Sequence, residues 1–371
     1  MTSRSRRAIF GGVGPVSGYA PGRVELLGNH TDYNAGVVLG AAIDRGLTVA
    51  GTRRDDDVIK LSSRAIAGGI AVSLADLRPE TKARWANYAL GVVEQFRAAR
   101  YPIGGFAAEV SGDLPAGAGL SSSAAFEVAM AGFLMKLYDL RVDPLAVARL
   151  CRRAENEFVG VQSGLLDQAT SVFGRADQMV FVDCRTEQIR TIPFPDGVVM
   201  VIAQSRGKHD LLESLYNQRR VECMSAAQAL GAASLRELTS AQLEDAGSNL
   251  DPILRRRAAH IVGENERVCR AVEILDSSKS PVEFGALMNA SHESSRTNFE
   301  NSTDELDQLV EIARSQPGVF GSRLTGGGFG GATVTLVETS RAPDVVAHLH
   351  PHATAVFVCR AAEGAAVTWS R

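Results

Sequence analysis

Short apolar runs, separated by polar and glycine-containing stretches, fill the first 200 residues of the chain. Apolar residues at alternate positions are typical of strands, and spacings of three and four are typical of amphipathic helices. The pattern predicts a loose arm over residues 1–18 and a strand that ends before Gly28. Further strands are predicted at residues 37–43, 47–51, 58–61, 70–74, 106–110, 179–183 and 189–193, and helices at residues 85–99, 126–138 and 144–159.

Longer helical periodicities dominate the second half, after a predicted buried strand at residues 198–203. At 371 residues the chain is long enough for two domains of roughly 100–200 residues each. We expect them at residues 1–193 and 194–371. Helices are predicted at residues 211–230, 253–275, 282–296, 304–315 and from 342, a break around 239–251, a glycine-rich interruption at 321–331, and strands at 332–337 and 355–359.

Residues 114–125 combine glycines, serines and the start of an apolar run. Gly117 and Gly119 precede three serines at 121–123, and a helical pattern follows. A glycine-rich turn at a helix N-terminus points backbone N–H groups and the positive end of the helix dipole at one place, which favours a phosphate. A tight turn followed by a helix capped by serine is the alternative interpretation.

Composition and charge narrow the function classes. The net charge of −3 and the scattered basic residues give no argument for binding nucleic acid or a membrane, and no apolar run approaches the ~20 residues that a membrane span needs. Five cysteines at unpaired spacings predict reduced thiols in a cytoplasmic protein. Three histidines within residues 348–352 are interpreted as a surface turn rather than a metal site, because no Cys or Asp ligand is near.

Two polar stretches carry candidate binding and catalytic groups. Residues 29–34, Asn-His-Thr-Asp-Tyr-Asn, offer many directional hydrogen-bonding groups, as a polyhydroxylated ligand requires. A turn that satisfies its own polar groups is the alternative. Asp167 lies among glycines and apolar residues at 160–168, where an acid is costly unless it pairs with a cation. The cap of a helix is the alternative for this residue.

Three glycine-containing motifs, at residues 21–34, 117–125 and 321–331, occur in an order that resembles the signature motifs of the GHMP kinases, which phosphorylate small metabolites such as galactose, homoserine and mevalonate. Residues 22–34, Gly-Arg-Val-Glu-Leu-Leu-Gly-Asn-His-Thr-Asp-Tyr-Asn, are similar to the galactokinase signature Gly-Arg-Val-Asn-Leu-Ile-Gly-Glu-His-Thr-Asp-Tyr-Asn. Matches to galactokinase patterns at residues 164–168, 209–223, 257–268 and 321–328 extend the resemblance to nearly the whole chain.

The resemblance implies a two-domain α+β fold of the GHMP kinase type. A ribosomal-S5-domain-2-like α/β domain would carry the first two motifs and Asp167, a ferredoxin-like C-terminal domain would hold a helix-backed antiparallel sheet, and the active site would lie in the cleft between them. The implied activity is phosphorylation of the anomeric 1-hydroxyl of galactose with ATP as donor and Mg²⁺ as cofactor. A monomer or weak homodimer is expected.

The resemblance also assigns roles to individual residues. Asp167 acts as general base or orients the sugar hydroxyl, and Arg23 stabilises Asp167 and the charge on the γ-phosphate. Ser123 and Glu155 coordinate Mg²⁺ directly or through water. A structural salt bridge is the alternative for Arg23, and an exposed helix carboxylate is the alternative for Glu155.

Implied contacts to the two substrates form two sets. The sugar contacts are Asn29, His30, Asp32, Gly164, Asp167 and Tyr216. The ATP contacts are Ser63, Trp85, Tyr88, Gly117, Ala118, Gly119, Leu120, Ser121, Ser122, Ser123 and Ala124. Core packing is the alternative for the two aromatic residues of the second set.

Two positions in the first motif depart from the galactokinase pattern. Asn29 stands where the family has a Glu that contacts the 6-hydroxyl of the sugar, and Glu25 replaces an Asn. Residues 291–299 also lack the usual acidic pair of the family. Because Asn carries no charge, a sugar-1-kinase for another or a 6-modified pyranose is an alternative.

Two further alternatives come from other classes of protein. One is a non-catalytic galactose and ATP sensor, against which the presence of Arg23, Ser123 and Asp167 argues. The other is an unrelated nucleotide-binding module, which the order of the three motifs disfavours.

Overall fold

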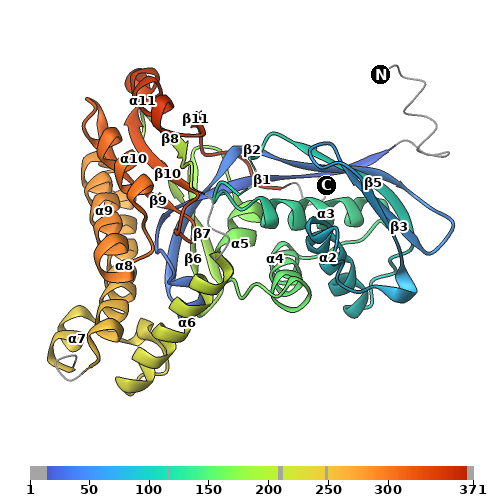
Figure 1. The fold of residues 1–371 in the computed structure, drawn as a ribbon, viewed down its shortest axis with the longest axis horizontal. Coiled ribbons are helices and arrows are strands. Elements are labelled where there is room, and N and C mark those ends of the chain that lie inside the picture. Colours follow the sequence, from blue (N-terminus) through green and yellow to red (C-terminus); the bar gives the residue numbers. More distant parts are fainter. Residues whose placement is uncertain (1–14, 116, 208–211, 247–249, 366–371) are drawn as a thin grey trace.

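The structure is a computed structural model of the 371-residue chain, and it describes residues 15–115, 117–207, 212–246 and 250–365. Two sheets lie side by side, each with its own helices (Figure 1). The predicted loose arm lies outside the described residues as far as residue 14, and the prediction is wrong from Val16 onward, where the first strand begins. Gly18 in that strand allows close contact with the backbone of the helix that packs on it.

The first sheet contains, among the described residues, seven strands in the order β4-β3-β5-β2-β6-β7, with β1 antiparallel along β2. Within this sheet the described strands β3 and β5 pair in parallel, and the other pairs are antiparallel. The strands are β1 Val16–Leu27, β2 Val37–Arg53, β3 Val58–Ser63, β4 Gly69–Ser73, β5 Phe106–Gly112, β6 Gln178–Asp183 and β7 Gln188–Pro193.

Strand β2 is longer than the apolar pattern predicts. Residues 37–43 and 47–51 were expected to form two strands, but β2 runs without interruption through the polar residues between them. It does so because β1 pairs with it from Leu27 opposite Leu39 to Val16 opposite Gly51. Asp44 is exposed, so its polar side chain costs the strand nothing.

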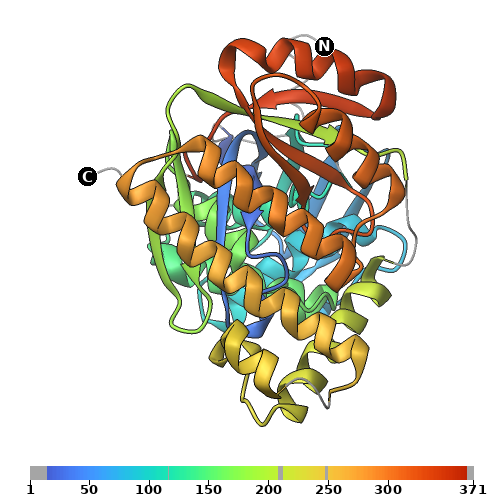
Figure 2. The same cartoon turned by 90° about the vertical axis from the view of Figure 1, so that its left-hand side faces the viewer.

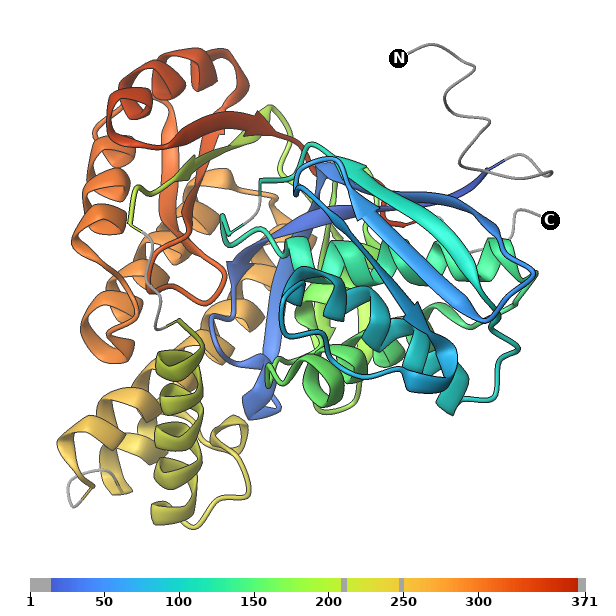
Figure 3. The same ribbon diagram turned by 45° about the vertical axis from the view of Figure 1, so that its right-hand side comes forward.

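Four helices cover one face of the first sheet (Figures 1 and 3). They are α2 Asn87–Ala98, α3 Ser122–Leu137, α4 Pro144–Arg153 and α5 Leu166–Phe173. Helix α3 begins four residues earlier than the predicted helix at 126–138. The predicted helix at 144–159 ends as a π-helical segment, Ala154–Val159, a geometry that often occurs at functional sites.

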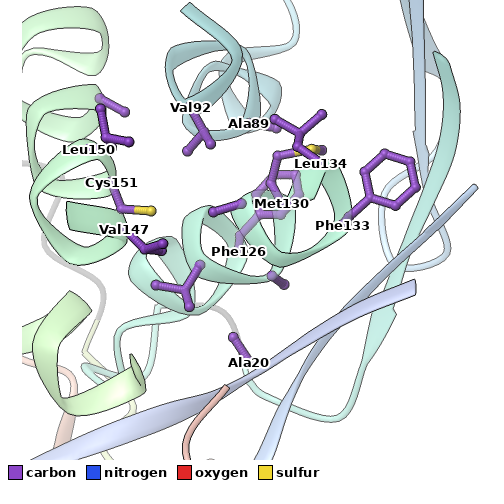
Figure 4. Close-up of a cluster of buried hydrophobic side chains, with 14 of the residues drawn as sticks. Ala20, Ala89, Val92, Phe126, Met130, Phe133, Leu134, Val147, Leu150 and Cys151 are labelled. Carbon is purple, nitrogen blue, oxygen red and sulfur yellow. The ribbon is translucent and has the colours of Figure 1, made fainter. Parts of the chain in front are cut away.

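Helix α3 is the centre of the first hydrophobic core (Figure 4). Its side chains Phe126, Met130 and Phe133 are buried between the sheet and the neighbouring helices, where α2 and α4 contribute residues such as Val92 and Cys151. The ring of Phe133 packs edge-on against Phe106 of β5, with ring centroids 5.4 Å apart. Truncation of Phe133 to alanine would cost about 3–5 kcal/mol, because it removes a completely buried ring and leaves a cavity.

The second sheet is antiparallel, in the order β11-β8-β10-β9, and helices cover both faces (Figure 2). Met200 and Ile202 of β8 face the core that includes α8 and α9, whereas Val199 and Val201 face α10 and α11. This explains the continuous apolar run at 198–203. The elements are β8 Val198–Gln204, β9 Val319–Thr325, β10 Ala332–Glu338, β11 Ala355–Cys359, α8 Pro252–Ser277, α9 Pro281–Ser294, α10 Asp304–Arg314 and α11 Ala342–Leu349.

Three predictions for the second half are wrong in detail. The first part of the glycine-rich stretch at 321–331 is strand β9, because it pairs with β10, and Gly321 leaves room for the backbone of Gly285 in α9. The predicted break at 239–251 contains helix α7, Ser240–Ala246. The predicted helix at 282–296 is α9 followed by a π-helical segment, Ser295–Phe299. Helix α6, Leu212–Ala229, agrees with the pattern, and His209 of the family match lies outside the described residues.

The two halves of the chain share a hydrophobic core. Val24 and Leu26 of β1 and Leu39 of β2 belong to the same buried cluster as Met200 of β8 and Phe284 of α9. The predicted domain boundary between residues 193 and 194 falls in the short connection from β7 to β8, and it stays a prediction. The shared core holds the two sheets together, and therefore also holds together the loops that project between them.

Other expectations concern single features. The five cysteines are free thiols, and three of them, Cys151, Cys223 and Cys359, are buried. The turn at His350–His352 is exposed, and the described residues contain no group of three or more His, Cys, Asp or Glu arranged to hold a metal ion. Within the part of the chain that the structure describes, no helix is long and apolar enough to cross a membrane.

Candidate active site

A cavity of about 330 Å³ lies where the loops of the two halves meet. Strand β1, the Gly-Ser turn (residues 117–123) and helix α5 contribute from the first half, and helix α6 and the glycine-rich loop after β9 contribute from the second. Among the predicted site residues, those that line the cavity are Arg23, Asn29, His30, Asp32, Gly117, Gly119, Leu120, Ser121, Ser122, Ser123, Glu155, Asp167 and Tyr216.

Six predicted site residues lie outside this lining, namely Ser63, Trp85, Tyr88, Ala118, Ala124 and Gly164. Ser63 ends strand β3, and Trp85 stacks on Phe126 with ring centroids 6.1 Å apart. Trp85 and Tyr88 both pack against the first core, as the alternative interpretation expected.

Arg23 and Asp167 are brought together across 144 residues of sequence. The guanidinium Nε of Arg23 donates to Asp167 Oδ1 at 2.7 Å, and Nη2 lies 2.6 Å from the same oxygen. Nη1 donates to the carbonyl of Gly119 at 2.8 Å. Ser121 Oγ donates to the other oxygen, Asp167 Oδ2. Guanidinium, carboxylate and hydroxyl therefore meet at the Gly-Ser turn, and such charge-assisted hydrogen bonds fix the orientation of the acid.

The Gly-Ser turn is not a turn capped by serine. Ser121 precedes the first residue of α3, but it has a φ of 52° and makes no side-chain capping bond, because its hydroxyl is used on Asp167. The first backbone N–H groups of α3 therefore remain available to an anion. Gly119, with a φ of +69°, lets the turn lie against Thr325 at the end of β9.

A second acidic group borders the same turn. Glu155 lies in the π-helical segment, and its Oε2 accepts hydrogen bonds from Ser163 Oγ and from Gln168 Nε2, the latter at 3.0 Å. The same Gln168 amide donates to Glu127 of α3 at 2.9 Å. Burial raises the pKa of Glu155, and the nearby Asp167 raises it further, while its hydrogen bonds lower it. A divalent cation beside Ser123 and Glu155 would favour the ionised carboxylate and so offset the effects of burial and of Asp167. These oxygen donors therefore fit Mg²⁺.

Asp32 is a third acidic residue that lines the cavity. Its Oδ1 accepts the backbone N–H of Tyr33 at 2.9 Å, and a side chain on Gly164 would overlap its Oδ2. Gly164 therefore leaves the space that the Asp32 carboxylate occupies. Burial, followed by repulsion from Asp167 and then Glu25, raises the pKa of Asp32 to about 7. A bound ligand that donates hydrogen bonds would favour the ionised form.

His30 is held in one orientation beside the glycine-rich loop that follows β9. Its Nε2 lies 2.9 Å from the carbonyl of Gly327, which accepts its proton, and its Nδ1 lies 2.7 Å from the Tyr33 hydroxyl, which donates. The ring packs between Tyr216 and Phe299, with centroids 4.9 and 4.6 Å away. Burial lowers its pKa to about 4, so the ring is neutral near pH 7.

Asn29 borders the cavity, but its polar atoms are used within the protein. Its Nδ2 donates to Glu25 Oε1 and to the carbonyl of Gly326, both at 2.8 Å. Its Oδ1 accepts from Asn301 Nδ2, also at 2.8 Å. The partner Glu25 is paired in turn with Arg323 of β9, which is completely buried. The resemblance to galactokinases implies that Asn29 contacts the sugar, whereas in the structure its side-chain amide is bonded within a polar network of the protein.

Glu264 of α8 is the anchor of that network. Its Oε2 accepts the backbone N–H groups of Gly28 at 2.8 Å and Asn29 at 2.9 Å, and its Oε1 pairs with Arg267 at 2.6 Å. These bonds and Arg267 lower the pKa of Glu264 despite its burial. Sequence analysis assigned no role to Glu264, Arg323 or Asn301. The signal that was available was the match to galactokinase patterns at residues 257–268 and 321–328, which contain Glu264 and Arg323 but do not show their partners.

Three family descriptions match the chain. "GHMP kinases N terminal domain" matches residues 87–175, "GHMP kinases C terminal" matches residues 271–351, and "Galactokinase galactose-binding signature" matches residues 7–53. A glycine-serine turn, an Arg–Asp pair and a late glycine-rich loop around one cavity, on this fold, define a GHMP kinase.

Sequence comparison with individual proteins identifies the family within the GHMP kinases. Galactokinase of Bos taurus is 41% identical over 99% of this chain and 96% of its own length, and galactokinase of Homo sapiens is 40% identical over the same shares. Galactokinase of Roseiflexus sp. is 41% identical over 93% of this chain and 91% of its own length. The chain belongs to the galactokinase family.

Solved structures agree with this assignment. Lactococcus lactis galactokinase, solved in complex with galactose, has a TM-score of 0.91 and 32% identity, with 95% of each chain covered. Mevalonate kinase of Methanococcus jannaschii has a TM-score of 0.70 at 19% identity, over 95% of this chain and 99% of its own, which supports the shared fold alone. The predicted GHMP kinase fold is confirmed.

Proposed function

We propose that this chain transfers the γ-phosphoryl group of ATP to the anomeric hydroxyl of galactose, and that Arg23, Asp167 and the Gly-Ser turn carry the reaction. The observation that supports this most strongly is the meeting of the Arg23–Asp167 pair with Ser121 and Gly119 in one cavity. Phosphoryl transfer needs positioning and neutralisation of charge more than covalent chemistry, and this cluster supplies both.

The reaction begins with the sugar hydroxyl bound to Asp167. Asp167 accepts its hydrogen bond, directs its oxygen at the γ-phosphorus and takes the proton as the new P–O bond forms. The bond from the γ-phosphorus to the bridging oxygen breaks, and ADP leaves with that electron pair. Arg23 is bound to Asp167 Oδ1 through Nε and Nη2, so it holds the acid in place and adds positive charge beside the transferring group.

The nucleotide phosphates would lie on the backbone N–H groups at the start of α3, in the turn that contains Gly117, Gly119 and Ser122. Ser123 and Glu155 would hold Mg²⁺, which neutralises charge on the phosphates when it is bound. Gln168 and Ser163 orient the Glu155 carboxylate toward the cavity through their bonds to its Oε2. Glu127 in turn holds Gln168, and its own pKa is raised well above the usual value by burial.

The sugar would lie between Asp167 and Asp32, against Tyr216 and His30. An ionised Asp32 can accept hydrogen bonds from two adjacent hydroxyls, which distinguishes one epimer from another. His30 and Asn29 shape this end of the cavity from within the protein, because their polar atoms are already bonded to protein groups. The cytoplasmic location and the monomeric or weakly dimeric state stay predictions.

The test is ADP release on a panel of sugars, with and without Mg²⁺. Galactose, talose, L-arabinose, fucose, N-acetylgalactosamine and galacturonate cover changes at each ring position. We expect turnover with galactose that requires Mg²⁺ and stops when the 1-hydroxyl is methylated. Turnover on another sugar but not on galactose would overturn the substrate, and ADP release on none of them, with both ligands bound, would identify a sensor.

A further inference from the structure

The two departures from the galactokinase signature are one feature of the structure. The carboxylate that the pattern has at residue 29 stands at residue 25, and the amide of residue 25 stands at residue 29. The two side chains are in direct contact, because Asn29 Nδ2 donates to Glu25 Oε1 at 2.8 Å. The charge has therefore not been lost from this end of the cavity. It has moved along the chain by four residues.

Arg323 explains why the carboxylate is tolerated at residue 25. Its guanidinium is completely buried, and Nη2 donates to Glu25 Oε1 at 3.1 Å while Nη1 donates to the Glu25 carbonyl at 3.2 Å. Thr325, on the same strand, bonds the Glu25 backbone through its hydroxyl. A buried arginine needs an anion, and Glu25 provides it here.

These contacts use only one of the two carboxylate oxygens. Glu25 Oε1 accepts from both Asn29 and Arg323, whereas Oε2 accepts no hydrogen bond from the described residues. Glu25 is only 5% exposed, and it lines the cavity that also contains Asp167. Oε2 is therefore available to a hydrogen-bond donor in the cavity, and at a largely buried carboxylate such a bond from a ligand is favourable.

The position of Glu25 on strand β1 indicates which part of the sugar would supply that donor. Arg23 and Glu25 lie on the same face of β1, in a stretch of regular register opposite Ala42 and Gly40. Two strand residues span roughly 7 Å, which is comparable to a pyranose ring with its hydroxyls. With the 1-hydroxyl at the Arg23–Asp167 pair, Glu25 faces the opposite side of the ring, where the 4- and 6-hydroxyls lie.

We infer that Glu25 is a specificity-determining residue, which accepts through Oε2 a hydrogen bond from the 4- or 6-hydroxyl of the sugar, while Asn29 and Arg323 hold its Oε1. This inference rests on the proposed function, because it needs the sugar to bind with its 1-hydroxyl at Asp167. It reverses the expectation from sequence that Asn29 leaves the far side of the sugar without a charged partner.

The experiment compares wild type with the E25Q variant on galactose and on its 2-deoxy, 4-deoxy and 6-deoxy analogues. In wild type, removal of the hydroxyl that Glu25 binds lowers kcat/KM about 10- to 100-fold, as expected for a hydrogen bond to a charged group. In E25Q, kcat/KM for galactose falls by a similar factor, mostly through KM, and removal of that same hydroxyl then costs little more. The loss of kcat/KM on removal of the 2-hydroxyl, and the KM for ATP, stay as in wild type.

The result that overturns the inference is an equal loss for every analogue. If E25Q lowers kcat/KM for galactose and for all three deoxy sugars by one common factor, Glu25 acts only by holding Arg323 and Asn29. Should E25Q not fold, E25D answers the same question, since it keeps the charge for Arg323 and withdraws the carboxylate from the cavity. The same selective loss is expected, and unchanged 4-deoxy and 6-deoxy factors would contradict the inference.

A matched control separates recognition from general loosening of the site. S322A removes a buried bond between Ser322 and Thr335, 2.8 Å long, on the strand that carries Arg323, without touching Glu25. We expect S322A to lower the melting temperature but to leave the ratio of kcat/KM for galactose to kcat/KM for each deoxy analogue unchanged. Loss in S322A of the ratio that marks the hydroxyl bound by Glu25 would overturn the inference. If wild type does not turn over galactose at all, the proposed function has failed. The same comparison, made with calorimetric Kd values, then still decides the role of Glu25.

Discussion

The two ends of the cavity are built from polar residues in different ways. At the end proposed to bind the nucleotide phosphates (the phosphate end), Arg23, Ser121 and Asp167 form one cluster within the first half of the chain, and the Asp167 side chain is 22% exposed. At the end proposed to bind the sugar (the sugar end), Glu25 and Asn29 are buried, and Arg323 and Asn301 of the second half donate hydrogen bonds to them.

Because the two ends differ in burial, we expect substitutions at one end to affect mainly catalysis and substitutions at the other end to affect stability as well. A polar group that meets solvent can lose a partner and be rehydrated, so a change at the phosphate end should lower the rate and leave folding intact. A buried network has no water to replace a lost partner, so a change at the sugar end should lower stability as well as binding. The substitutions below test this separation, in order of decreasing effect.

The largest effect is expected for Asp167→Asn. Asparagine keeps the shape of the side chain but cannot take the proton of the sugar hydroxyl, so kcat should fall about 10²- to 10⁴-fold. The melting temperature and the Kd for ATP should change little. Coupled ADP release, calorimetry and thermal unfolding measure these quantities. Asp55→Asn, at an exposed position, is the matched control. A kcat like that of wild type would exclude the proposed role of Asp167.

Glu264→Gln should have the largest effect on folding. It removes the charge that holds the Gly28 and Asn29 backbone and pairs with Arg267, and we expect a loss of about 3 kcal/mol in the free energy of unfolding at pH 7. Because folding lowers the pKa of Glu264, its stabilisation is present above the usual value of 4.5 and is lost as the pH falls further. The difference in the free energy of unfolding between wild type and Glu264→Gln should therefore become smaller as the pH falls below 4.5.

Urea unfolding at pH 7 and at lower pH measures this effect. Glu273→Gln on the same helix is the matched control, since Glu273 is exposed and pairs only with Arg270 among the described residues. It should change the free energy of unfolding by less than about 1 kcal/mol. Equal losses for the two variants would refute the claim that the buried network supports the sugar end.

Gly164→Ala tests the sugar end with a single methyl group. The added carbon would overlap Asp32 Oδ2, so Asp32 must turn away from the sugar, and KM for galactose should rise about 10- to 100-fold. KM for ATP should change less than about twofold, because the methyl group is not added to the Gly-Ser turn. Gly104→Ala, where the nearest atoms are 3.8 Å away, should behave as wild type. A rise in both KM values would show that the two ends are not independent.

The smallest effect is a pH dependence that comes from Asp32. Its pKa of about 7 lies above the usual 3.8, so the folded protein without ligand binds the extra proton, and Asp32 reduces stability as the pH rises from about 4 to 7. Sugar binding needs the ionised form. KM for galactose at pH 6 should therefore be about tenfold higher than above pH 8. In Asp32→Asn this pH dependence should disappear, and a wild-type KM that does not vary with pH would contradict the assignment.

Much of the architecture was predictable because local pattern decides local structure. The buried strand at 198–203 and the helices near 253–275 and 304–315 are present within a few residues of their predicted limits. The elements that were wrong depend on distant partners. Strand β2 continues through Asp44 because β1 lies beside it, and Gly321 belongs to a strand because β10 pairs with it.

The same holds for the site. The sequence alone determined that a glycine-serine turn before an apolar helix would present N–H groups, and that Asp167, set among apolar residues, would need a cation. These conclusions follow from residue type, since the cost of an unpaired charge does not depend on where the partner comes from.

Only the tertiary structure decided which groups meet. Arg323 pairs with Glu25 across 298 residues, and Asn301 binds Asn29 across 272. Any buried charge needs a partner of opposite charge. Which of the many charged residues becomes that partner depends on how the two sheets pack over their shared core. For this reason the exchange at residues 25 and 29 appeared in the sequence as a lost sugar contact, and in the structure as a carboxylate that still faces the cavity.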